Sequence, residues 1–300
     1  MRVMNELELL APGKLNLVLR VGPRDASGFH PLASWMCTVS LFDTLCIART
    51  ATQGIAFECN DSSLPTDSGN LVVRAAELYF QKLKVGSPSD GGISITLKKR
   101  IPAAAGLGGG SSDAAATLVG INRLLDGRLP SARLAEEAQA LGSDVPFFLA
   151  APSAWCTGRG EKTFPLSPPT VAKWAMIVLP PFGLSTADVY RRFDELALGR
   201  MEYLSRPLDL DVWPQLPAQQ LLTKLENDLE RPAFDLRPEL GEMRLAIERT
   251  IDRPVRMSGS GSALFSLFDA EPEANRACEN TLQRFAVKAV AVKLAPDGAM

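Results

Sequence analysis

Glycines crowd one short stretch of this 300-residue chain and limit what it can form there. Residues 101–116 read IPAAAGLGGGSSDAAA, and four of the five residues from Gly106 to Gly110 are glycine. Glycine loses the most conformational entropy on folding, so such a cluster is typical of backbone that turns sharply or approaches another group closely. The helix expected over Asp113–Leu125 puts the cluster at its amino end, where free N–H groups and the positive end of the dipole face outward. The pattern therefore predicts a phosphate site at Gly106–Ser112.

Two common phosphate-binding patterns do not match this stretch. A P-loop needs a lysine directly after its second glycine, and no lysine follows the glycines here. A dinucleotide fingerprint needs G-x-G-x-x-G, and Ser111 stands where the third glycine belongs. Interpretation of the chain as a nicotinamide-dependent oxidoreductase would therefore rest on Gly106 and Gly108 alone. Asp113 poses a conflict, because it favours the helix dipole but would repel a phosphate; it must point away or lie near a cation.

Segments typical of strands and helices are mixed along the chain without strict alternation. We expect strands at 7–10, 15–19, 35–40, 43–49 and 93–97, and helices beginning at Asn70, Asp113, Ser131 and Ser143. Beyond Ser167–Thr170 we expect strands at 174–179, 255–257, 264–268 and 288–294, and helices at 189–198, 221–230, 239–250 and 273–284. This order predicts an α+β protein with domains at 1–168 and 169–300.

The composition argues against several classes of protein. Hydrophobic residues make up 46% and charged residues 22%, as in ordinary globular chains, and a net charge of −2 does not favour nucleic acid or an anionic membrane as partner. The five cysteines are scattered, none is in C-x-x-C spacing, and His30 is the only histidine, which argues against disulfides and a zinc site. No apolar run resembles a signal peptide or a membrane span, so we expect a soluble cytoplasmic protein.

Several separated motifs resemble those of one known family. Pro102–Ser112 (PAAAGLGGGSS) is similar to the glycine loop of the GHMP kinases, Met257–Ala263 (MSGSGSA) to their C-terminal glycine motif, and Pro12–Leu17 (PGKLNL) to their N-terminal motif. Together with GFHP at 28–31, NLVVRA at 70–75 and LGSDVP at 141–146, they most resemble a branch of that family. Its members phosphorylate the tertiary 2-hydroxyl of a methylerythritol linked to cytidine diphosphate, in the non-mevalonate route to isoprenoid precursors.

The resemblance implies a fold and a set of ligands. It implies the two-domain GHMP kinase fold, with an N-terminal domain like the second domain of ribosomal protein S5, a C-terminal ferredoxin-like domain, and an active site in the cleft between them. ATP and Mg²⁺ would be the cofactors, and no metal ligand is assigned. The partner would be a small molecule with a cytidine diphosphate moiety, with no nucleic acid and no membrane, and the chain would be a monomer or a weak homodimer.

The resemblance also implies where ATP binds. The glycine loop would hold its phosphates, through Pro102, Ala103, Ala104, Ala105, Gly106, Leu107, Gly108, Gly109, Gly110, Ser111 and Ser112. Asn70 and Lys99 match family positions near the ATP nucleoside, although Lys98–Arg100 could equally form a solvated basic edge. Met257–Ala263 would shape the wall of the cleft near the phosphates.

Lys14 and Asp144 are the candidates for catalysis. Ser143 is typical of a helix N-cap, and a carboxylate in the first helical turn is held in the ionised form that a general base needs. Strand alternation puts Lys14 and Asn16 on one face, where a lysine could stabilise the base and the developing alkoxide. By position alone, a solvated lysine and an ordinary helix-start aspartate are the commoner outcomes; the family motifs favour catalysis.

Four further residues are expected to bind the substrate. Asn16 would orient it, and the resemblance implies that His30 helps to bind the cytosine ring. Phe29 stands where the family usually has tyrosine, so it could stack on a base but not donate from a hydroxyl. Thr186 matches a threonine that contacts substrate. Two alternatives stay open, namely a GHMP kinase for another small alcohol and a catalytically silent nucleotide-binding protein.

Overall fold

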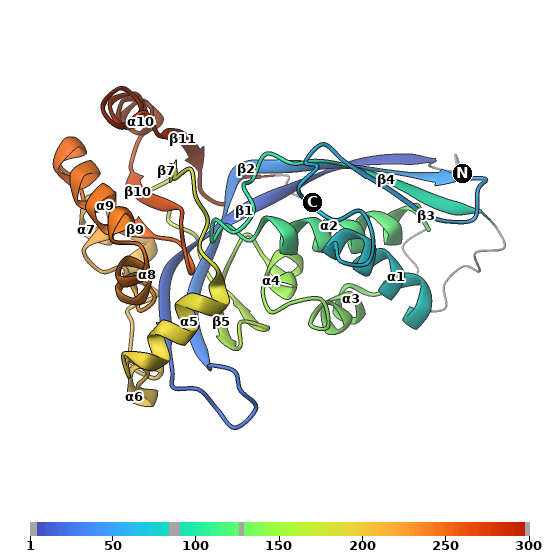
Figure 1. The fold of residues 1–300 in the computed structure, drawn as a ribbon, viewed down its shortest axis with the longest axis horizontal. Coiled ribbons are helices and arrows are strands. Elements are labelled where there is room, and N and C mark those ends of the chain that lie inside the picture. Colours follow the sequence, from blue (N-terminus) through green and yellow to red (C-terminus); the bar gives the residue numbers. More distant parts are fainter. Residues whose placement is uncertain (1–4, 84–90, 126–128, 298–300) are drawn as a thin grey trace.

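Two long antiparallel strands carry the architecture of the protein. The structure, a computed structural model, describes residues 5–83, 91–125 and 129–297. β1 (Glu6–Val21) and β2 (Leu32–Thr50) pair along the length of the molecule, as Figure 1 shows. Their pairing shifts at Pro12/Gly13 and Asn16/Val18. The short strands expected at 7–10 and 15–19 are therefore parts of one strand, and those at 35–40 and 43–49 are parts of another.

The larger sheet is built around these two strands. In the described residues its order is β3-β4-β2-β1-β8, and β5 and β6 extend it from β2. The added strands are β3 (Gly54–Cys59), β4 (Gly92–Lys98), β5 (Ser153–Gly158), β6 (Lys162–Pro165) and β8 (Glu226–Asn227). The sequence patterns indicated only β4. The helix expected at 221–230 is wrong, because it is replaced by a short helix, the two-residue strand β8 and the start of another helix.

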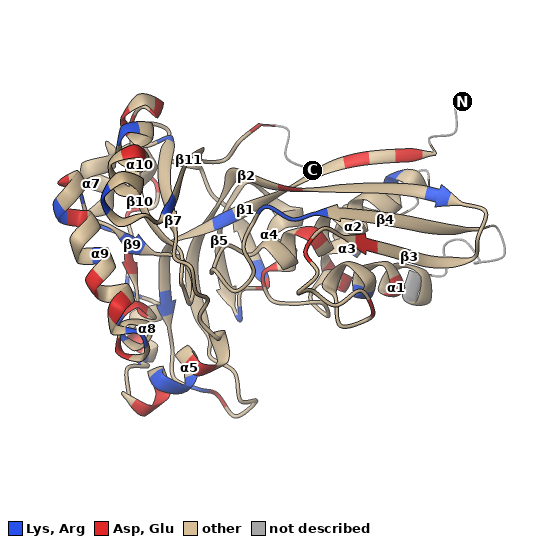
Figure 2. Cartoon of the chain, turned by 45° about the horizontal axis from the view of Figure 1, so that its top comes forward, with Lys and Arg blue, Asp and Glu red and all other residues tan. Residues whose placement is uncertain are grey.

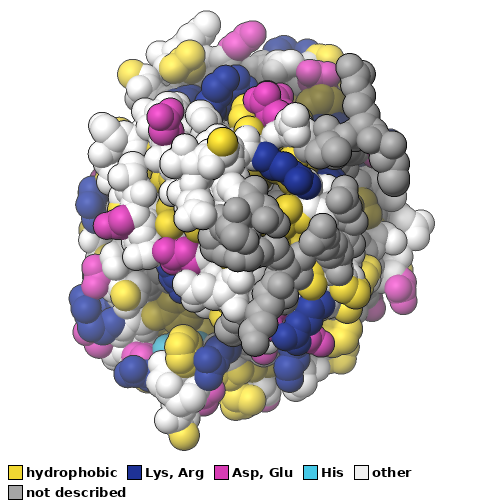
Figure 3. All heavy atoms as spheres, turned by 90° about the vertical axis from the view of Figure 1, so that its right-hand side faces the viewer, with side chains coloured by type: hydrophobic (Ala, Val, Ile, Leu, Met, Phe, Trp, Pro, Cys, Tyr) yellow, Lys and Arg dark blue, Asp and Glu magenta, His cyan; other side chains and the backbone are white. Residues whose placement is uncertain are grey.

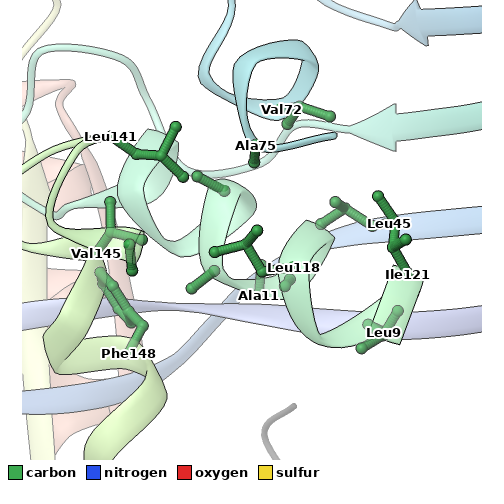
Figure 4. Close-up of a cluster of buried hydrophobic side chains, with 14 of the residues drawn as sticks. Leu9, Ala11, Leu45, Val72, Ala75, Leu118, Ile121, Leu141, Val145 and Phe148 are labelled. Carbon is green, nitrogen blue, oxygen red and sulfur yellow. The ribbon is translucent and has the colours of Figure 1, made fainter. Parts of the chain in front are cut away.

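Four helices pack on one face of this sheet and enclose a core. They are α1 (Leu71–Leu83), α2 (Gly109–Leu124), α3 (Ser131–Ala138) and α4 (Val145–Ala150). Figure 4 shows Leu118 and Ile121 of α2 beside Leu9 of β1 and Leu45 of β2, all of them buried. This packing fixes the amino end of α2, and with it the glycine loop, relative to β1.

The smaller sheet is antiparallel and lies at the other end of the molecule (Figure 1). Its order is β11-β7-β10-β9, formed by β7 (Trp174–Leu179), β9 (Arg256–Met257), β10 (Leu264–Phe268) and β11 (Lys288–Lys293). The helices of this part are α5 (Thr186–Glu195), α6 (Met201–Leu204), α7 (Ala218–Leu222), α8 (Glu230–Leu236), α9 (Pro238–Ile251) and α10 (Glu271–Phe285), with a 3₁₀ turn at Trp213–Gln215. Sheets and helices together confirm the predicted α+β class.

The two parts share buried surface. Leu15 and Trp35 of the long strands pack in one cluster with Ile177 of β7 and Phe265 of β10. The strand β8, from the second part of the chain, pairs in parallel with β1 of the first. The boundary between residues 168 and 169 stays a prediction.

The outer surface carries charges of both signs. Basic and acidic residues are interspersed over α8, α9 and α10 in Figure 2. At the opposite end of the molecule they are mixed with hydrophobic side chains, as Figure 3 shows. Within the described residues, no helix combines the length and the apolar character needed to span a membrane.

Candidate active site

Three motifs that are far apart in the sequence meet at one place. The backbone N–H of Lys14 in β1 donates to the carbonyl oxygen of Leu107 over 2.9 Å. From the turn between β9 and β10, the N–H of Ala263 donates to the carbonyl of Ala105 over 3.0 Å, and the Ser258 hydroxyl donates to the carbonyl of Gly106 over 3.0 Å. The glycine loop is therefore held between β1 and the second glycine motif.

Two glycines of the loop permit these contacts. Gly106 has a φ of 75°, and a Cβ there would lie 2.1 Å from the carbonyl oxygen of Ser258. Gly108, with a φ of 69°, stands at the N-cap of α2, and its Cβ would lie 3.0 Å from Cγ of Lys14. No larger residue fits either position without displacing its neighbours, so the glycines allow Lys14 and the second glycine motif to approach the loop.

Lys14 is buried in the floor of the site. Its side chain is 4% exposed, and Nζ donates to Oδ1 of Asn16 over 2.5 Å and to the carbonyl of Gly106 over 3.0 Å. Nζ also lies 3.6 Å from Oδ2 of Asp144. Lys14 and Asn16 thus share a face as predicted, and the alternative of a solvated lysine on an exposed strand face is wrong.

Asp144 stands at the start of α4 but does not cap it. It occupies the N-cap position that the sequence pattern gave to Ser143, and its side chain accepts no capping hydrogen bond. With 30% of its side chain exposed, the carboxylate faces Lys14 and remains open to a ligand. The pair of a buried ammonium and an accessible carboxylate can take a proton from a hydroxyl and stabilise the resulting oxyanion.

The conflict at Asp113 is resolved by Lys99. Nζ of Lys99 donates to Oδ2 of Asp113 over 2.8 Å and to Oδ2 of Asp43 over 2.5 Å, and all three side chains are buried. Burial alone would lower the pKa of Lys99, but the carboxylates of Asp113 and Asp43 outweigh it and the pKa is raised. Burial, reinforced by Asp43, also raises the pKa of Asp113 in spite of Lys99. The cation that Asp113 requires is therefore a lysine of the chain.

Two buried polar atoms at the start of α2 have no protein partner. Among the described residues, Oγ of Ser112 and Oδ1 of Asp113 accept and donate no hydrogen bond. Buried polar atoms are normally paired, so unpaired ones call for an explanation such as a bound ligand or water. The adjacent N–H groups of the first helical turn lack intrahelical acceptors as well. Because Ser112 is buried behind the loop and a carboxylate oxygen accepts, the donors that this end of α2 offers to a phosphate group are these backbone N–H groups.

One cavity of about 980 Å³ brings the predicted residues together. Its lining includes Lys14, Asn16, Phe29, His30, Asn70, Lys99, residues 102–111, Asp144 and Thr186. Ser112 is the exception, because it is buried behind the loop and does not line the cavity. Asn70 uses its side chain locally, donating to the carbonyl of Pro65 and accepting from the N–H of Val72.

The far end of the cavity is formed by a loop of the larger sheet and by α5. Nε2 of His30 lies 2.7 Å from Oδ1 of Asp194, and the His30 ring centroid lies 4.9 Å from that of Tyr190. Oγ1 of Thr186 lies 2.8 Å from Oγ of Ser260 in the second glycine motif. The α5 helix therefore connects the His30 end of the cavity to the glycine end.

Sequence reasoning missed two of these residues. Thr186, Tyr190 and Asp194 are spaced four residues apart on α5, and all three line the cavity. Residues four apart share a helix face, so the predicted Thr186 could have led to the other two. No local pattern links His30 to Asp194, because 164 residues separate them.

The chain is similar to known proteins over nearly its whole length. Residues 70–151 match the family model described as the GHMP kinases N terminal domain. A 4-diphosphocytidyl-2-C-methyl-D-erythritol kinase of Desulfotalea psychrophila is 37% identical over 297 residues, which cover 97% of this chain and 96% of the relative.

Solved structures agree with this relative. A crystal structure of 4-(cytidine 5'-diphospho)-2C-methyl-D-erythritol kinase superposes with a TM-score of 0.77 at 37% identity, over 96% of this chain and 99% of the other. Homoserine kinase from Cytophaga hutchinsonii shares the fold with a TM-score of 0.71, at only 17% identity and over 98% and 96% of the two chains.

Proposed function

The chain belongs to the 4-diphosphocytidyl-2-C-methyl-D-erythritol kinases of the GHMP kinase family, and we propose that Lys14 and Asp144 carry out its phosphoryl transfer. The reaction moves the terminal phosphoryl group of ATP to the 2-hydroxyl of 4-diphosphocytidyl-2-C-methyl-D-erythritol, in the non-mevalonate pathway to isoprenoid precursors. The observation that carries the proposal is the 3.6 Å separation of Lys14 Nζ from Asp144 Oδ2 in the cavity beside the glycine loop.

The proposed roles follow from the two side chains. Asp144 takes the proton of the acceptor hydroxyl as that oxygen attacks the γ-phosphorus and the bond to the β-phosphate oxygen breaks. A lysine ammonium has three N–H donors, and two of those of Lys14 are used by Asn16 and Gly106. The third is available to Asp144 and to the acceptor oxygen. Because Lys14 is held by two acceptors, its charge is in position before the substrate arrives.

The glycine loop is proposed to hold the phosphates of ATP. The residues at the start of α2 up to Ser111 line the cavity, and each well-placed N–H or hydroxyl donor is worth about 3 kcal/mol to a developing charge. Lys99 is too deeply engaged with Asp43 and Asp113 to serve as a free phosphate ligand. We therefore propose that Lys99 keeps Asp113 from repelling the phosphates and contributes to the wall near the nucleoside.

Mg²⁺ fits the oxygen atoms that this cavity offers. No group of three or more His, Cys, Asp or Glu side chains able to hold a metal occurs among the described residues. Magnesium in kinases takes one or two protein ligands and completes its shell with phosphate oxygens and water. The hydroxyl of Ser111, which lines the cavity, would hold it together with phosphate oxygens and water, because Asp144 must stay free to take the proton. When bound, the ion would neutralise charge on the transferring phosphate.

The other end of the cavity is proposed to receive the cytidine. The Phe29 ring is half exposed, the His30 ring lies against Tyr190, and aromatic side chains of this kind accept a flat base between them. We further propose that the enzyme works in the cytoplasm, where all five of its unpaired cysteines would stay reduced. The expectation of a monomer or weak homodimer stays a prediction.

A coupled assay of ADP release tests the proposed substrate. We expect turnover with 4-diphosphocytidyl-2-C-methyl-D-erythritol and none with mevalonate, homoserine or galactose at the same concentration. Turnover on one of those three alone would overturn the assignment.

A further inference from the structure

The turn between β5 and β6 contributes an arginine, Arg159, to the lining of the cavity. It reads Gly158-Arg159-Gly160-Glu161, and the two glycines have φ values of 74° and 114°. Oε2 of Glu161 accepts the backbone N–H of Arg159 over 2.6 Å, and a Cβ on Gly158 would lie 2.5 Å from Oε1 of Glu161. The turn therefore depends on its glycines and fixes the backbone of Arg159.

Arg159 lies between Asp144, the proposed base, and the ring of Phe29, which is proposed to receive the cytosine. The residue after it, Gly160, packs against the base, since a Cβ there would lie 3.6 Å from Oδ1 of Asp144. Its own guanidinium carbon lies 3.8 Å from the ring centroid of Phe29, and Nη2 donates to Oγ of Ser27 over 2.8 Å. One side chain thus reaches from beside the proposed base to the aromatic ring proposed for the cytosine.

The charge of Arg159 is not neutralised by a direct ion pair. Among the described residues no carboxylate lies within ion-pair distance of its guanidinium, and Asp25 is reached only through the Ser27 hydroxyl, which donates to its Oδ1 over 2.5 Å. Arg191, which also lines the cavity, differs in being paired with Asp188 over 2.7 Å. A guanidinium has five donors in a flat fork, and within the part of the chain that the structure describes only Nη2 of Arg159 has a protein acceptor.

We propose that Arg159 binds the diphosphate of the acceptor substrate. The inference rests on the proposed function, because in that substrate the diphosphate joins the nucleoside to the alcohol. With the cytosine at Phe29 and the hydroxyl at Asp144, the diphosphate lies between them, beside Arg159. The flat fork of an arginine matches the geometry of phosphate oxygens. The guanidinium covers one face of Phe29 and leaves the other face for the base.

Binding of cytidine and of cytidine diphosphate separates this role from a purely structural one. Calorimetry on the wild type, Arg159→Met and Arg159→Lys gives the ratio of the two affinities for each protein. We expect Arg159→Met to weaken the binding of cytidine diphosphate by about tenfold and the binding of cytidine by much less. The affinity of Arg159→Lys for cytidine diphosphate should lie between those of the wild type and Arg159→Met. If both ligands weaken equally, or neither does, Arg159 does not contact the diphosphate and the proposal is overturned.

Steady-state kinetics supply a second measurement. Arg159→Met should raise KM for the acceptor by about tenfold and leave KM for ATP and kcat within about twofold. Arg276→Met on α10 removes the same charge from an exposed position far from the cavity and should match the wild type in all three constants. An unchanged KM for the acceptor would count against the proposal. Wild-type turnover tests the proposed function separately, because the affinity ratio requires no catalysis.

Discussion

The imidazole of His30 and the carboxylate of Asp194 join the two parts of the molecule at the far end of the cavity. Their atoms Nε2 and Oδ1 lie 2.7 Å apart, with His30 7% and Asp194 34% exposed. His30 lies in the loop between β1 and β2 of the larger sheet, whereas Asp194 lies on α5 of the second part. Because Asp194 occupies one ring nitrogen, only Nδ1 and the ring face of His30 remain for a ligand.

Asp194→Asn should weaken binding of the acceptor without slowing the chemical step. Loss of the charged acceptor frees the His30 ring to rotate, so we expect KM for the acceptor to rise by about three- to tenfold, with kcat nearly unchanged. Glu195→Gln on the same helix, which loses an exposed pair with Arg192, is the matched control. Equal KM values in wild type and Asp194→Asn would show that the contact does not orient His30.

Asp144→Asn should lower kcat by a factor on the order of 10² or more while ATP still binds. The amide keeps the shape of the side chain but cannot take the proton of the acceptor hydroxyl. Single-turnover ADP release measures the loss, and titration with a non-hydrolysable ATP analogue checks the nucleotide site. A variant with near-normal kcat would mean that another group, or no group, acts as base.

Lys99→Met should destabilise the protein by about 3–5 kcal/mol, because two buried carboxylates lose their common cation. Asp113→Asn should lower the free energy of unfolding much less. In that variant Asp43 still accepts hydrogen bonds from Lys99 and from the backbone N–H groups of Arg100 and Ile101. Urea unfolding of both variants beside the wild type measures the difference. The model of a shared lysine fails if the two substitutions have the same cost.

Gly106→Ala and Gly110→Ala should change stability in opposite directions. A Cβ at Gly106 meets a carbonyl oxygen at 2.1 Å in a backbone conformation with positive φ, so unfolding should become easier by more than about 1 kcal/mol. Gly110 lies inside α2, and a Cβ there meets nothing nearer than 3.6 Å. Alanine at this position should therefore raise the free energy of unfolding by as much as about 1 kcal/mol. Thermal unfolding of the two variants is the measurement, and a loss at both positions would contradict this account of the loop.

Features of the fold and the site that depend on a local sequence pattern could be predicted from the sequence. The glycine cluster predicted a close approach of backbone, and strand alternation predicted that Lys14 and Asn16 share a face. Both depend on the residue's own conformation or its nearest neighbours. Apart from Ser112, the site residues that the motifs indicated line a single cavity, although their chemical roles remain proposals.

Long-range contacts set the limits of that reasoning. Residues 221–230 resemble a helix, but Glu226 and Asn227 pair with β1, and the Asn227 amide donates to the carbonyls of Met257 and Gly259. Tertiary hydrogen bonds of this kind override local helix propensity. The lysine beside Asp113 and the arginine over Phe29 likewise come from other segments, and nothing near Asp113 or Phe29 in the sequence indicates them.

The hydrogen bond from the N–H of Asn16 to the hydroxyl of Ser258 spans 242 residues, and this distance has a consequence during synthesis. A ribosome adding roughly 5–20 residues per second needs roughly 12–50 seconds to pass from the first of these residues to the second. Throughout that interval the nascent chain carries Lys14, and once residue 112 has been added also the glycine loop, without the segment that packs against them. The proposed catalytic centre is thus among the last features to form, and the unfinished chain lacks the complete site that we propose for nucleotide.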